Sequence, residues 1–212
     1  MALSYQTYIL GSLENNSYLL VDQPSGDCVI IDPSFNAVRI AKDIQSKGLK
    51  LKQIWLTHAH FDHICGAPDL MEITKPRPEI LLHPADLPLY RNGGEADLFG
   101  MRFNSSDDPR NMLDNGNNLM IGTSIVEVRF TPGHTPGHVI FYVKELSTAF
   151  CGDLIFQGSV GRTDLPGGDQ DLLFKSIASE ILTLPPETKL LSGHGAESSV
   201  GEEQKYNPFL QG

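Results

Sequence analysis

Short apolar runs and turn residues alternate along the N-terminal part of the chain, and this pattern predicts sheet followed by helix. Residues 18–21 and 28–31 are β-rich runs separated by the turn-forming segment DQPSG, so they predict an antiparallel hairpin. Between Ala37 and Lys47 apolar residues recur with helical spacing, and Gly48 follows as a stop signal. We therefore expect a helix on one face of a sheet.

The same alternation continues in the middle of the chain. Residues 53–57 form an apolar run that predicts a buried strand, and this strand leads directly into the segment HAHFDH at 58–63. A helix-like stretch at 66–73 and a short strand at 80–83 follow. From 91 to 118 the chain is polar and has no sustained period, and it includes the segment NSSDDP at 104–109. This composition predicts a long, partly helical surface excursion.

Further strands and a helix are predicted in the C-terminal half. Residues 125–131 and 139–143 flank the segment PGHTPGH, and the strand predicted at 149–153 ends in Asp153. Residues 171–184 have the apolar spacing of a helix that two prolines end, and 189–191 form a last strand that leads into SGHG. The alternation predicts an α/β (α+β) fold in which two sheets have helices on their outer faces.

Length, composition and charge set the broad class. A chain of 212 residues with 40% apolar and 20% charged residues can bury a full core as one domain spanning residues 1–212. Neither a signal peptide nor a stretch of membrane-spanning length is recognisable, so we expect a cytoplasmic protein that does not bind membranes. The net charge of −10 argues against nucleic acid as a partner, because phosphate binding needs clustered Lys and Arg.

The cysteines suggest neither disulfides nor a thiolate metal site. Cys28, Cys65 and Cys151 are odd in number, far apart and without a C-x-x-C pair. We expect them to be small buried hydrophobic residues in a reducing compartment.

Metal-binding residue types are concentrated at 58–63. Residues two apart in an extended segment point the same way, so His58 and His60 can share one ion, and Asp62 and His63 then face a second. Histidines also cluster by chance on surface loops. Four residues of metal-ligating types lie within six positions, directly after a buried strand, and this favours a metal site over chance.

Three more candidate ligands each follow a separate predicted strand and have glycine neighbours, namely His134, Asp153 and His194. Alone, each would be an ordinary polar residue, but together with 58–63 they place five of the seven histidines in one pattern. Imidazole and carboxylate groups without thiolates suit two divalent ions if one carboxylate bridges them, with zinc as the first expectation and iron or manganese as alternatives. Asp153 is the candidate bridge.

Hydrolysis is the natural chemistry of such a pair of ions. Two neighbouring ions lower the pKa of a water molecule to about 7 and polarise an electrophilic oxygen. Asp62 and Asp153 are the carboxylates that we expect to take part in catalysis.

The chain resembles a known family through these same segments. THAHFDH at 57–63, TPGH at 131–134, GD at 152–153 and GH at 193–194 are similar to the motifs of the metallo-β-lactamase superfamily, and the similarity extends over nearly the whole chain. Within it, GSVGRTDLPGG at 158–168 and NPFL at 207–210 resemble the glyoxalase II (hydroxyacylglutathione hydrolase) branch, in its short bacterial type. The resemblance implies a four-layer αββα sandwich with the site at the edge between the sheets.

The resemblance also implies a division of the ligands between two metals. His58, His60 and His134 would bind one metal, Asp62, His63 and His194 the other, and Asp153 both.

Two departures from the longer glyoxalase II proteins concern the substrate. Those proteins carry a C-terminal helical domain that binds glutathione, and we expect this chain to lack it. They also use a Lys and, two residues later, a Tyr to bind glutathione; Arg162 stands at the first position and Asp164 at the second. Arg162 is therefore either a substrate-binding residue that clasps a carboxylate or a structural Arg paired with a neighbouring Asp.

The implied activity is hydrolysis of a small-molecule thioester of the hydroxyacylglutathione kind. A persulfide dioxygenase is the nearest alternative, and it would hold one iron through His58, His134 and Asp153. A hydrolase of another ester or lactone and a metal-binding module without activity are further alternatives. β-Lactamase activity is disfavoured by the bridging carboxylate, and RNA processing by the charge. The oligomeric state is left open.

Several polar residues are candidates for supporting roles. Metal-bound imidazoles normally donate their second N–H to an acceptor, so Thr57, Asp32 and His138 are candidate outer partners. For His138 we favour a structural role. Asn15 and Asn16 precede the first predicted strand, where turn hydrogen bonds are the expectation and contact with the site is the minority alternative.

Overall fold

The computed structural model describes residues 2–103, 105 and 107–211. Asn104 and Ser106, which belong to the predicted polar excursion, lie outside the described residues, as do Met1 and Gly212.

The N-terminal half of the chain builds the first sheet. Within the described residues its six strands lie in the order β1 (Leu3–Leu10), β2 (Asn15–Asp22), β3 (Asp27–Ile31), β4 (Lys50–Trp55), β5 (Glu79–Leu82) and β6 (Asn111–Met112). Neighbours are antiparallel from β1 to β3 and parallel from β3 to β6. The predicted hairpin is confirmed as β2 and β3, whereas the edge strand β1 was not predicted from the sequence.

The C-terminal half builds the second sheet. In the described part of the chain its six strands lie in the order β14 (Ser198–Ser199), β13 (Lys189–Ser192), β10 (Thr148–Gly152), β9 (Val139–Val143), β8 (Ser124–Phe130) and β7 (Asn118–Ile121). Only β10 and β13 are parallel among these pairs of described strands. A separate hairpin joins β11 (Ile155–Phe156) and β12 (Ser159–Val160).

Helices cover the outer faces of both sheets. Those from the N-terminal half are α1 (Val38–Ser46), α2 (Phe61–Ile64), α3 (Ala67–Ile73), η1 (Pro84–Asp86), α4 (Leu87–Arg91) and η2 (Gly93–Phe99). Those from the C-terminal half are η3 (Lys144–Leu146), α5 (Gln170–Ser176), η4 (Ile177–Ile181), α6 (Val200–Tyr206) and η5 (Pro208–Leu210). None of the helices among the described residues is long and apolar enough to cross a membrane.

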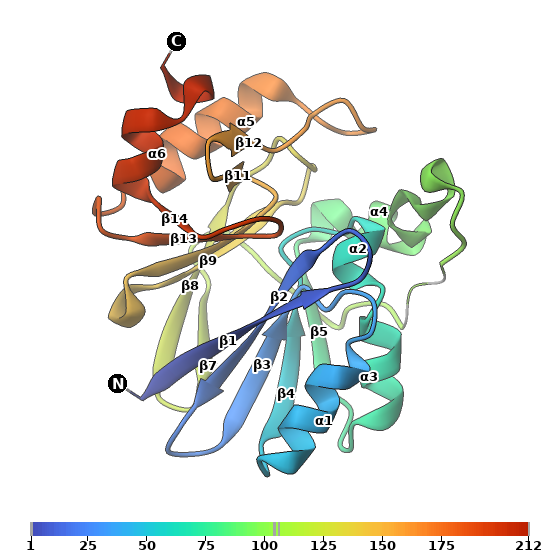
Figure 1. The fold of residues 1–212 in the computed structure, drawn as a ribbon. Helices are drawn as coiled ribbons and strands as arrows, with labels where there is room; N and C mark the ends of the chain where they lie inside the picture. The colour runs from blue at the N-terminus through green and yellow to red at the C-terminus, as the bar shows by residue number, and fades with distance from the viewer. Residues whose placement is uncertain (1, 104, 106, 212) are drawn as a thin grey trace.

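Figure 1 shows the four layers of the fold, and three apolar clusters mark the interfaces between them. One cluster lies between α1 and α3 and the first sheet, the second lies between the two sheets, and the third lies between the second sheet and α5 with η4. In the second cluster, Trp55 of β4 packs against Phe141 of β9 with ring centroids 5.2 Å apart. The αββα sandwich implied by the sequence is confirmed.

The helix predicted at 37–47 shows how the sequence forms one of these layers. Ile40 and Ile44 are one helical turn apart and both are buried against the first sheet. Full burial of an isoleucine side chain contributes about 1.5–3 kcal/mol. The helix is followed by Gly48, whose positive φ of 63° suits a residue without Cβ.

The predicted surface excursion at 91–118 is wrong in one part. Residues 93–96 are buried, and they form the start of η2. Gly94 has a φ of 63°, and a Cβ there would lie 2.3 Å from the Phe61 backbone nitrogen and 2.6 Å from the Ala59 carbonyl oxygen. The segment 93–96 is polar and rich in glycine, so the sequence carries no apolar signal that would predict its close packing on the 58–63 segment.

Candidate metal centre

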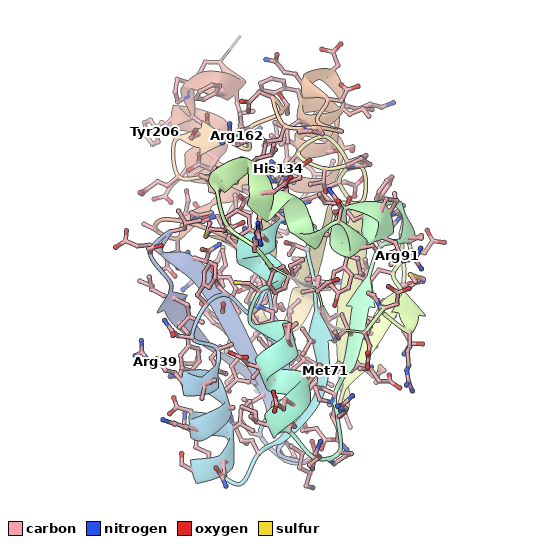
Figure 2. All side chains as sticks on the ribbon, turned by 90° about the vertical axis from the view of Figure 1, so that its right-hand side faces the viewer. Arg39, Met71, Arg91, His134, Arg162 and Tyr206 are labelled. Atoms are coloured by element: carbon pink, nitrogen blue, oxygen red, sulfur yellow. The ribbon has the colours of Figure 1, made fainter. Side chains whose placement is uncertain are left out.

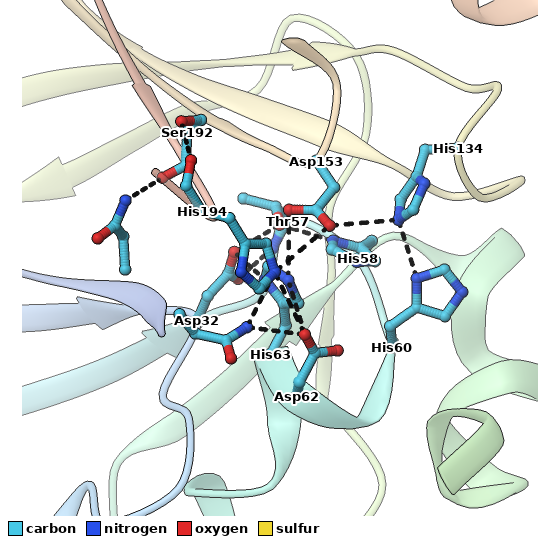
Figure 3. A network of polar contacts seen from close by, with 12 residues as sticks. Asp32, Thr57, His58, His60, Asp62, His63, His134, Asp153, Ser192 and His194 are labelled. Atoms are coloured by element: carbon cyan, nitrogen blue, oxygen red, sulfur yellow. Dashed lines mark hydrogen bonds and ion pairs between the residues drawn. The ribbon is translucent and has the colours of Figure 1, made fainter. Parts of the chain in front are cut away.

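The candidate ligands gather where strands of both sheets end. The segment 58–63 follows β4, His134 follows β8, Asp153 follows β10 and His194 follows β13. Figure 3 shows these side chains converging from the two sheets on one place. The structure therefore brings together all seven residues that the sequence pattern singled out.

One group consists of His58, His60 and His134. One ring nitrogen of each lies within 4.8 Å of the others, which suits three ligands of one ion. His60 Nδ1 and His134 Nε2 are 2.9 Å apart. The prediction that His58 and His60 point the same way, because they are two residues apart in an extended segment, therefore agrees with the structure.

The second group consists of Asp62, His63 and His194, and their candidate ligand atoms also lie within 4.8 Å of one another. His194 Nε2 is 3.3 Å from Asp62 Oδ2. Asp153 lies between the two groups. Its Oδ1 is 3.4 Å from His63 Nε2, and its Oδ2 is 3.7 Å from His134 Nε2. This position matches the bridging role expected from the sequence.

Several buried atoms at this place have no hydrogen-bond partner among the described residues. They are His58 Nε2, His63 Nε2 and Asp153 Oδ1. A buried polar group left unpaired costs about 1–3 kcal/mol, so a protein rarely retains several together without a use for them. Metal ions at the two groups would engage all three atoms, and the residues present therefore fit a two-metal centre.

Two of the candidate ligands, His58 and Asp153, already have the protonation state that suits a metal. Burial and the neighbouring His63 hold the pKa of His58 well below its ordinary value, so this imidazole is neutral. Burial raises the pKa of Asp153, but the adjacent His63 and His134 outweigh it and keep the pKa well below its ordinary range. Neutral imidazole and ionised carboxylate are the forms that bind metal. Burial lowers the pKa of His63, but Asp153 and Asp62 outweigh it and hold that pKa well above its ordinary value, so His63 must lose a proton to bind a metal.

In most of these imidazoles, the ring nitrogen that points away from the centre has a hydrogen-bond acceptor of its own. His63 Nδ1 donates to Asp32 Oδ2 at 3.0 Å, and His134 Nδ1 donates to the Arg162 carbonyl oxygen at 2.8 Å. His194 Nδ1 donates to the Leu13 carbonyl oxygen at 3.0 Å. These bonds fix the tautomer and direct Nε2 toward the centre.

Asp32 and Thr57 form the outer support that the sequence suggested. Thr57 Oγ1 donates to Asp32 Oδ2 at 2.6 Å and lies 3.0 Å from His58 Nδ1, from which it can accept. Asp32 Oδ1 accepts from the Thr57 backbone N–H at 2.8 Å. Because both Asp32 oxygens are already engaged, this carboxylate fits an orienting role better than a ligand role.

His138 has the structural role favoured from the sequence. It is fully buried, and its Nε2 accepts from the backbone N–H of Asp153 at 3.2 Å. Its Nδ1 donates to Thr131 Oγ1 at 2.8 Å. His138 thus fixes the backbone on which Asp153 is carried.

A pocket of about 410 Å³ opens over the centre. Besides five of the candidate ligands it is lined by Leu13, Phe61, Phe99, Phe156, Ser159, Val160, Arg162 and Leu165. Arg162 is among the residues that line this pocket, and its guanidinium donates two hydrogen bonds of 2.7 Å to Asp164. Both alternatives for Arg162 are therefore present in its geometry. Figure 2 shows Arg162 beside His134, far from Arg39 and Met71.

Comparison with known proteins adds a family. The model of the metallo-beta-lactamase superfamily matches residues 10–194, which include every candidate ligand. This chain belongs to the metallo-beta-lactamase superfamily.

Several relatives of known name lie within this superfamily. A probable metallo-hydrolase, YqgX of Bacillus subtilis, is 38% identical over 96% of this chain and 95% of its own length. The hydroxyacylglutathione hydrolase GloC of Haemophilus influenzae is 34% identical over 94% of each chain. The human mitochondrial persulfide dioxygenase ETHE1 is 32% identical over 92% of this chain and 70% of its own length. These names support a metal-dependent enzyme but differ in the reaction.

Solved structures of superfamily members are similar over the whole fold. The B3 metallo-beta-lactamase BLEG-1 has a TM-score of 0.92 and 35% identity, covering 99% of this chain and 100% of the other. TTHA1623, solved in a di-iron-bound form, has a TM-score of 0.87 and 41% identity, covering 97% of this chain and 100% of the other. A neighbour that holds two irons supports a metal-binding role for the His and Asp cluster.

Asn15 and Asn16 correct a prediction. Turn hydrogen bonds were expected, but Asn15 Nδ2 donates to Asp62 Oδ2 at 2.8 Å and so holds a candidate ligand. Asn16 Nδ2 donates to the carbonyl oxygens of Ser192 and Gly195 on either side of His194, at 3.0 and 2.9 Å. Both residues belong to β2, whose start lies beside the β13 end in the other sheet. This crossing of sheets could not be inferred from local sequence.

Asp86 was missed altogether. This buried carboxylate accepts from the Ala59 backbone N–H at 3.0 Å, from the Gly137 backbone N–H at 2.6 Å and from Thr135 Oγ1 at 2.8 Å. It therefore ties the 58–63 segment to the loop that carries His134. Burial raises its pKa, an effect that these three hydrogen bonds oppose. Its position soon after the predicted strand at 80–83 was the only sequence signal.

Proposed function

We propose that this superfamily member hydrolyses thioesters of the hydroxyacylglutathione kind with the help of two divalent metal ions. The observation that carries the proposal is the placement of Asp153 between two three-residue groups of candidate ligands. The relative GloC, a hydroxyacylglutathione hydrolase that matches nearly the whole chain, supports the substrate class.

The residues present suit two ions. His58, His60 and His134 would hold one ion, and Asp62, His63 and His194 the other, with Asp153 shared. Zinc is the first expectation for such nitrogen and oxygen ligands, while iron is supported by the di-iron form of TTHA1623 and manganese remains a third choice. When bound, the ions lower the pKa of a water molecule to about 7 and stabilise negative charge on a carbonyl oxygen.

The chain's own residues complete the reaction. Asp62, held at Oδ2 by Asn15, is the carboxylate placed to accept the proton of the attacking water. The water oxygen then bonds to the thioester carbon, the C–S bond breaks, and the departing sulfur takes up the proton that Asp62 accepted, so that it leaves as a thiol. Asp153 stays ionised throughout, since its neighbours keep its pKa well below its ordinary range. No side-chain nucleophile is required.

The pocket determines how the substrate is held. Leu13, Phe99 and Phe156 offer apolar walls near the centre, and Arg162 is the single cationic residue among those that line it in the described structure. Because Asp164 already pairs with Arg162, the guanidinium has less to offer a substrate carboxylate. A charged glutathione tail should therefore bind weakly, with a raised KM.

Persulfide oxidation is the second candidate, supported by the similarity to ETHE1. His58, His134 and Asp153 are all present and close together, as a mononuclear iron site would require. Asp62, His63 and His194 would then have no role in metal binding. Their close arrangement favours the two-metal hydrolase.

One experiment separates these functions. Purified protein is analysed for bound metals and assayed in parallel for hydrolysis of lactoylglutathione and for oxygen uptake with glutathione persulfide. Hydrolysis of a β-lactam is also assayed, because the similar protein BLEG-1 is named a B3 metallo-beta-lactamase. Thioester hydrolysis with two metals per chain supports the proposal. Oxygen uptake with one iron per chain, or β-lactam hydrolysis without thioester hydrolysis, would overturn it.

A further inference from the structure

A buried carboxylate outside the candidate ligand set faces His60. Glu95 belongs to η2, only 6% of its surface is exposed, and its Oε2 lies 3.7 Å from His60 Nε2. Neither of these two atoms has a hydrogen-bond partner within the described chain. Two buried polar atoms of complementary chemistry thus face each other, each without another partner.

The orientation of the His60 ring explains why an acceptor is needed there. His60 Nδ1 lies 2.9 Å from His134 Nε2, so Nδ1 is the nitrogen that points toward the centre. Nε2 points away from it, toward Glu95. For Nδ1 to offer a lone pair to a metal, the ring proton must be on Nε2, and a buried N–H requires an acceptor.

The other imidazoles of the set support this interpretation by contrast. Each has a close acceptor for its outward nitrogen: Thr57 for His58, Asp32 for His63, and a backbone carbonyl oxygen for both His134 and His194. His60 differs because its outward nitrogen is Nε2 and its facing group is Glu95. The terminal torsion of a glutamate is broad, so a small rotation brings the pair within hydrogen-bond distance.

The backbone around Glu95 is held against the loop that carries His60. Glu95 has a φ of 63°, in the left-handed region that residues with a Cβ rarely adopt, and it follows Gly94 in the same region. Gly94 lies so close to Phe61 and Ala59 that no side chain would fit. Uncommon backbone conformations of this kind persist where surrounding contacts require them, often beside functional sites.

We infer that Glu95 is a positioning residue whose carboxylate accepts a hydrogen bond from the Nε2–H of His60 and thereby keeps Nδ1 free for the metal that His58 and His134 would also bind. This role concerns metal binding and does not depend on which substrate the centre acts on. Glu95 itself touches neither substrate nor metal. Its effect is restricted to the group that contains His60.

Metal binding to stripped protein tests this role apart from activity. Zn²⁺ is titrated calorimetrically into full-length wild type and into Glu95→Gln, Glu95→Ala and the control Asp97→Asn, an exposed acid on the same segment. We expect Glu95→Ala to lower affinity at the His60 group by about 10–100-fold, and Glu95→Gln by less because its amide oxygen still accepts a hydrogen bond. Affinity at the group of Asp62, His63 and His194 should not change, and Asp97→Asn should match wild type.

A spectroscopic measurement adds a signature that a purely structural role would not give. In protein labelled with ¹⁵N-histidine, the His60 ring should be protonated at Nε2 in wild type and become a mixture of tautomers in Glu95→Ala. Glu95→Gln keeps the side-chain length, so it preserves the test if Glu95→Ala does not fold. The inference would be overturned if the Gln and Ala variants kept the Zn²⁺ affinity and the His60 tautomer of wild type. It would also be overturned if Zn²⁺ affinity fell equally at both metal groups while the unfolding temperature fell.

Discussion

The two groups of candidate ligands differ in how far they are enclosed. All three members of the first group are buried, and so are Asp62 and His63 of the second, whereas the His194 side chain is 29% exposed. Around the first group, buried contacts come from Thr57, from Glu95 and, through two loops, from Asp86. Both groups line the pocket, the first through His60 and His134 and the second through Asp62 and His194, but among these His194 is the most exposed. We therefore expect the first, more enclosed group to retain its metal more firmly than the second, more open group.

Removal of Asp153 should have the largest effect on metal content and activity, because both groups of ligands share this carboxylate. Asp153→Ala leaves two neighbouring cations without their shared anion, so we expect loss of both metals and of measurable activity. Metal analysis after dialysis and the thioester assay check this. The comparison variant is Asp32→Asn, which affects an outer acceptor and should cost about 10–100-fold in affinity or activity. Equal effects of the two substitutions would show that Asp153 is not a bridge.

Single histidine variants should separate the groups. His60→Ala and His194→Ala should each reduce the metal content from two ions per chain to one, and each affinity loss should exceed the about 10–100-fold expected for an outer partner. Because His194 belongs to the group with Asp62 and His63, His194→Ala should leave the ion at His58, His60 and His134 bound. Stepwise titration with Zn²⁺ measures this. If either variant lost both ions together, the two groups would be a single unit.

Asp86 should stabilise the enclosed group in particular. Asp86→Ala leaves the Ala59 and Gly137 N–H groups without their acceptor, which should lower the free energy of unfolding by about 3 kcal/mol. Urea unfolding of the metal-free protein measures the loss, and the exposed Asp97→Ala is the control. Hydrogen exchange should accelerate at the Ala59 and Gly137 amides and stay slow at His194. A uniform acceleration would contradict a local role.

The sequence predicted the candidate ligands better than the residues that support them. Strand-end motifs brought out the seven candidate residues, because a ligand that follows a buried strand is recognisable from local pattern alone. Two sheets with outer helices followed from the same alternation, and the four-layer sandwich from the resemblance to the superfamily. By contrast, Asp86 and Glu95 act across loops that are far from their partners in sequence, and neither lies in a recognisable motif. Asn15 contacts Asp62, which lies 47 residues away in the sequence, only because the folded first sheet brings the two segments together. Contacts that tertiary packing creates leave no local trace.

Elements at the margins of the sheets were also missed for physical reasons. The edge strand β1 looks polar in the sequence because it contains Ser4, Gln6 and Thr7. An edge strand can carry such residues, since only part of its length packs in the core. In the helix predicted at 171–184, the second half is a π-helix, η4, which apolar spacing cannot distinguish from an α-helix.

Arg162 should give the smallest effect, confined to substrate affinity at the open side of the site. Its side chain is half-exposed and lines the pocket, and Asp164 engages two of its nitrogens. If it contacts the substrate, Arg162→Ala should raise KM for lactoylglutathione with little change in kcat, the result expected when an interaction is equally strong in ground state and transition state. Arg162→Lys should restore only part of the affinity because the planar fork is lost.

The Arg91–Asp108 pair offers a matched control for this substitution. It is also held by more than one hydrogen bond and has a similar exposure, and Figure 2 shows Arg91 well away from Arg162. Exposed pairs of this kind contribute at most about 1 kcal/mol to stability, so neither Arg91→Ala nor Arg162→Ala should greatly change the unfolding temperature. Asp164→Asn should free the guanidinium and lower KM. An unchanged KM in Arg162→Ala, or a kcat that falls with it, would show that Arg162 serves the loop through Asp164 rather than the substrate.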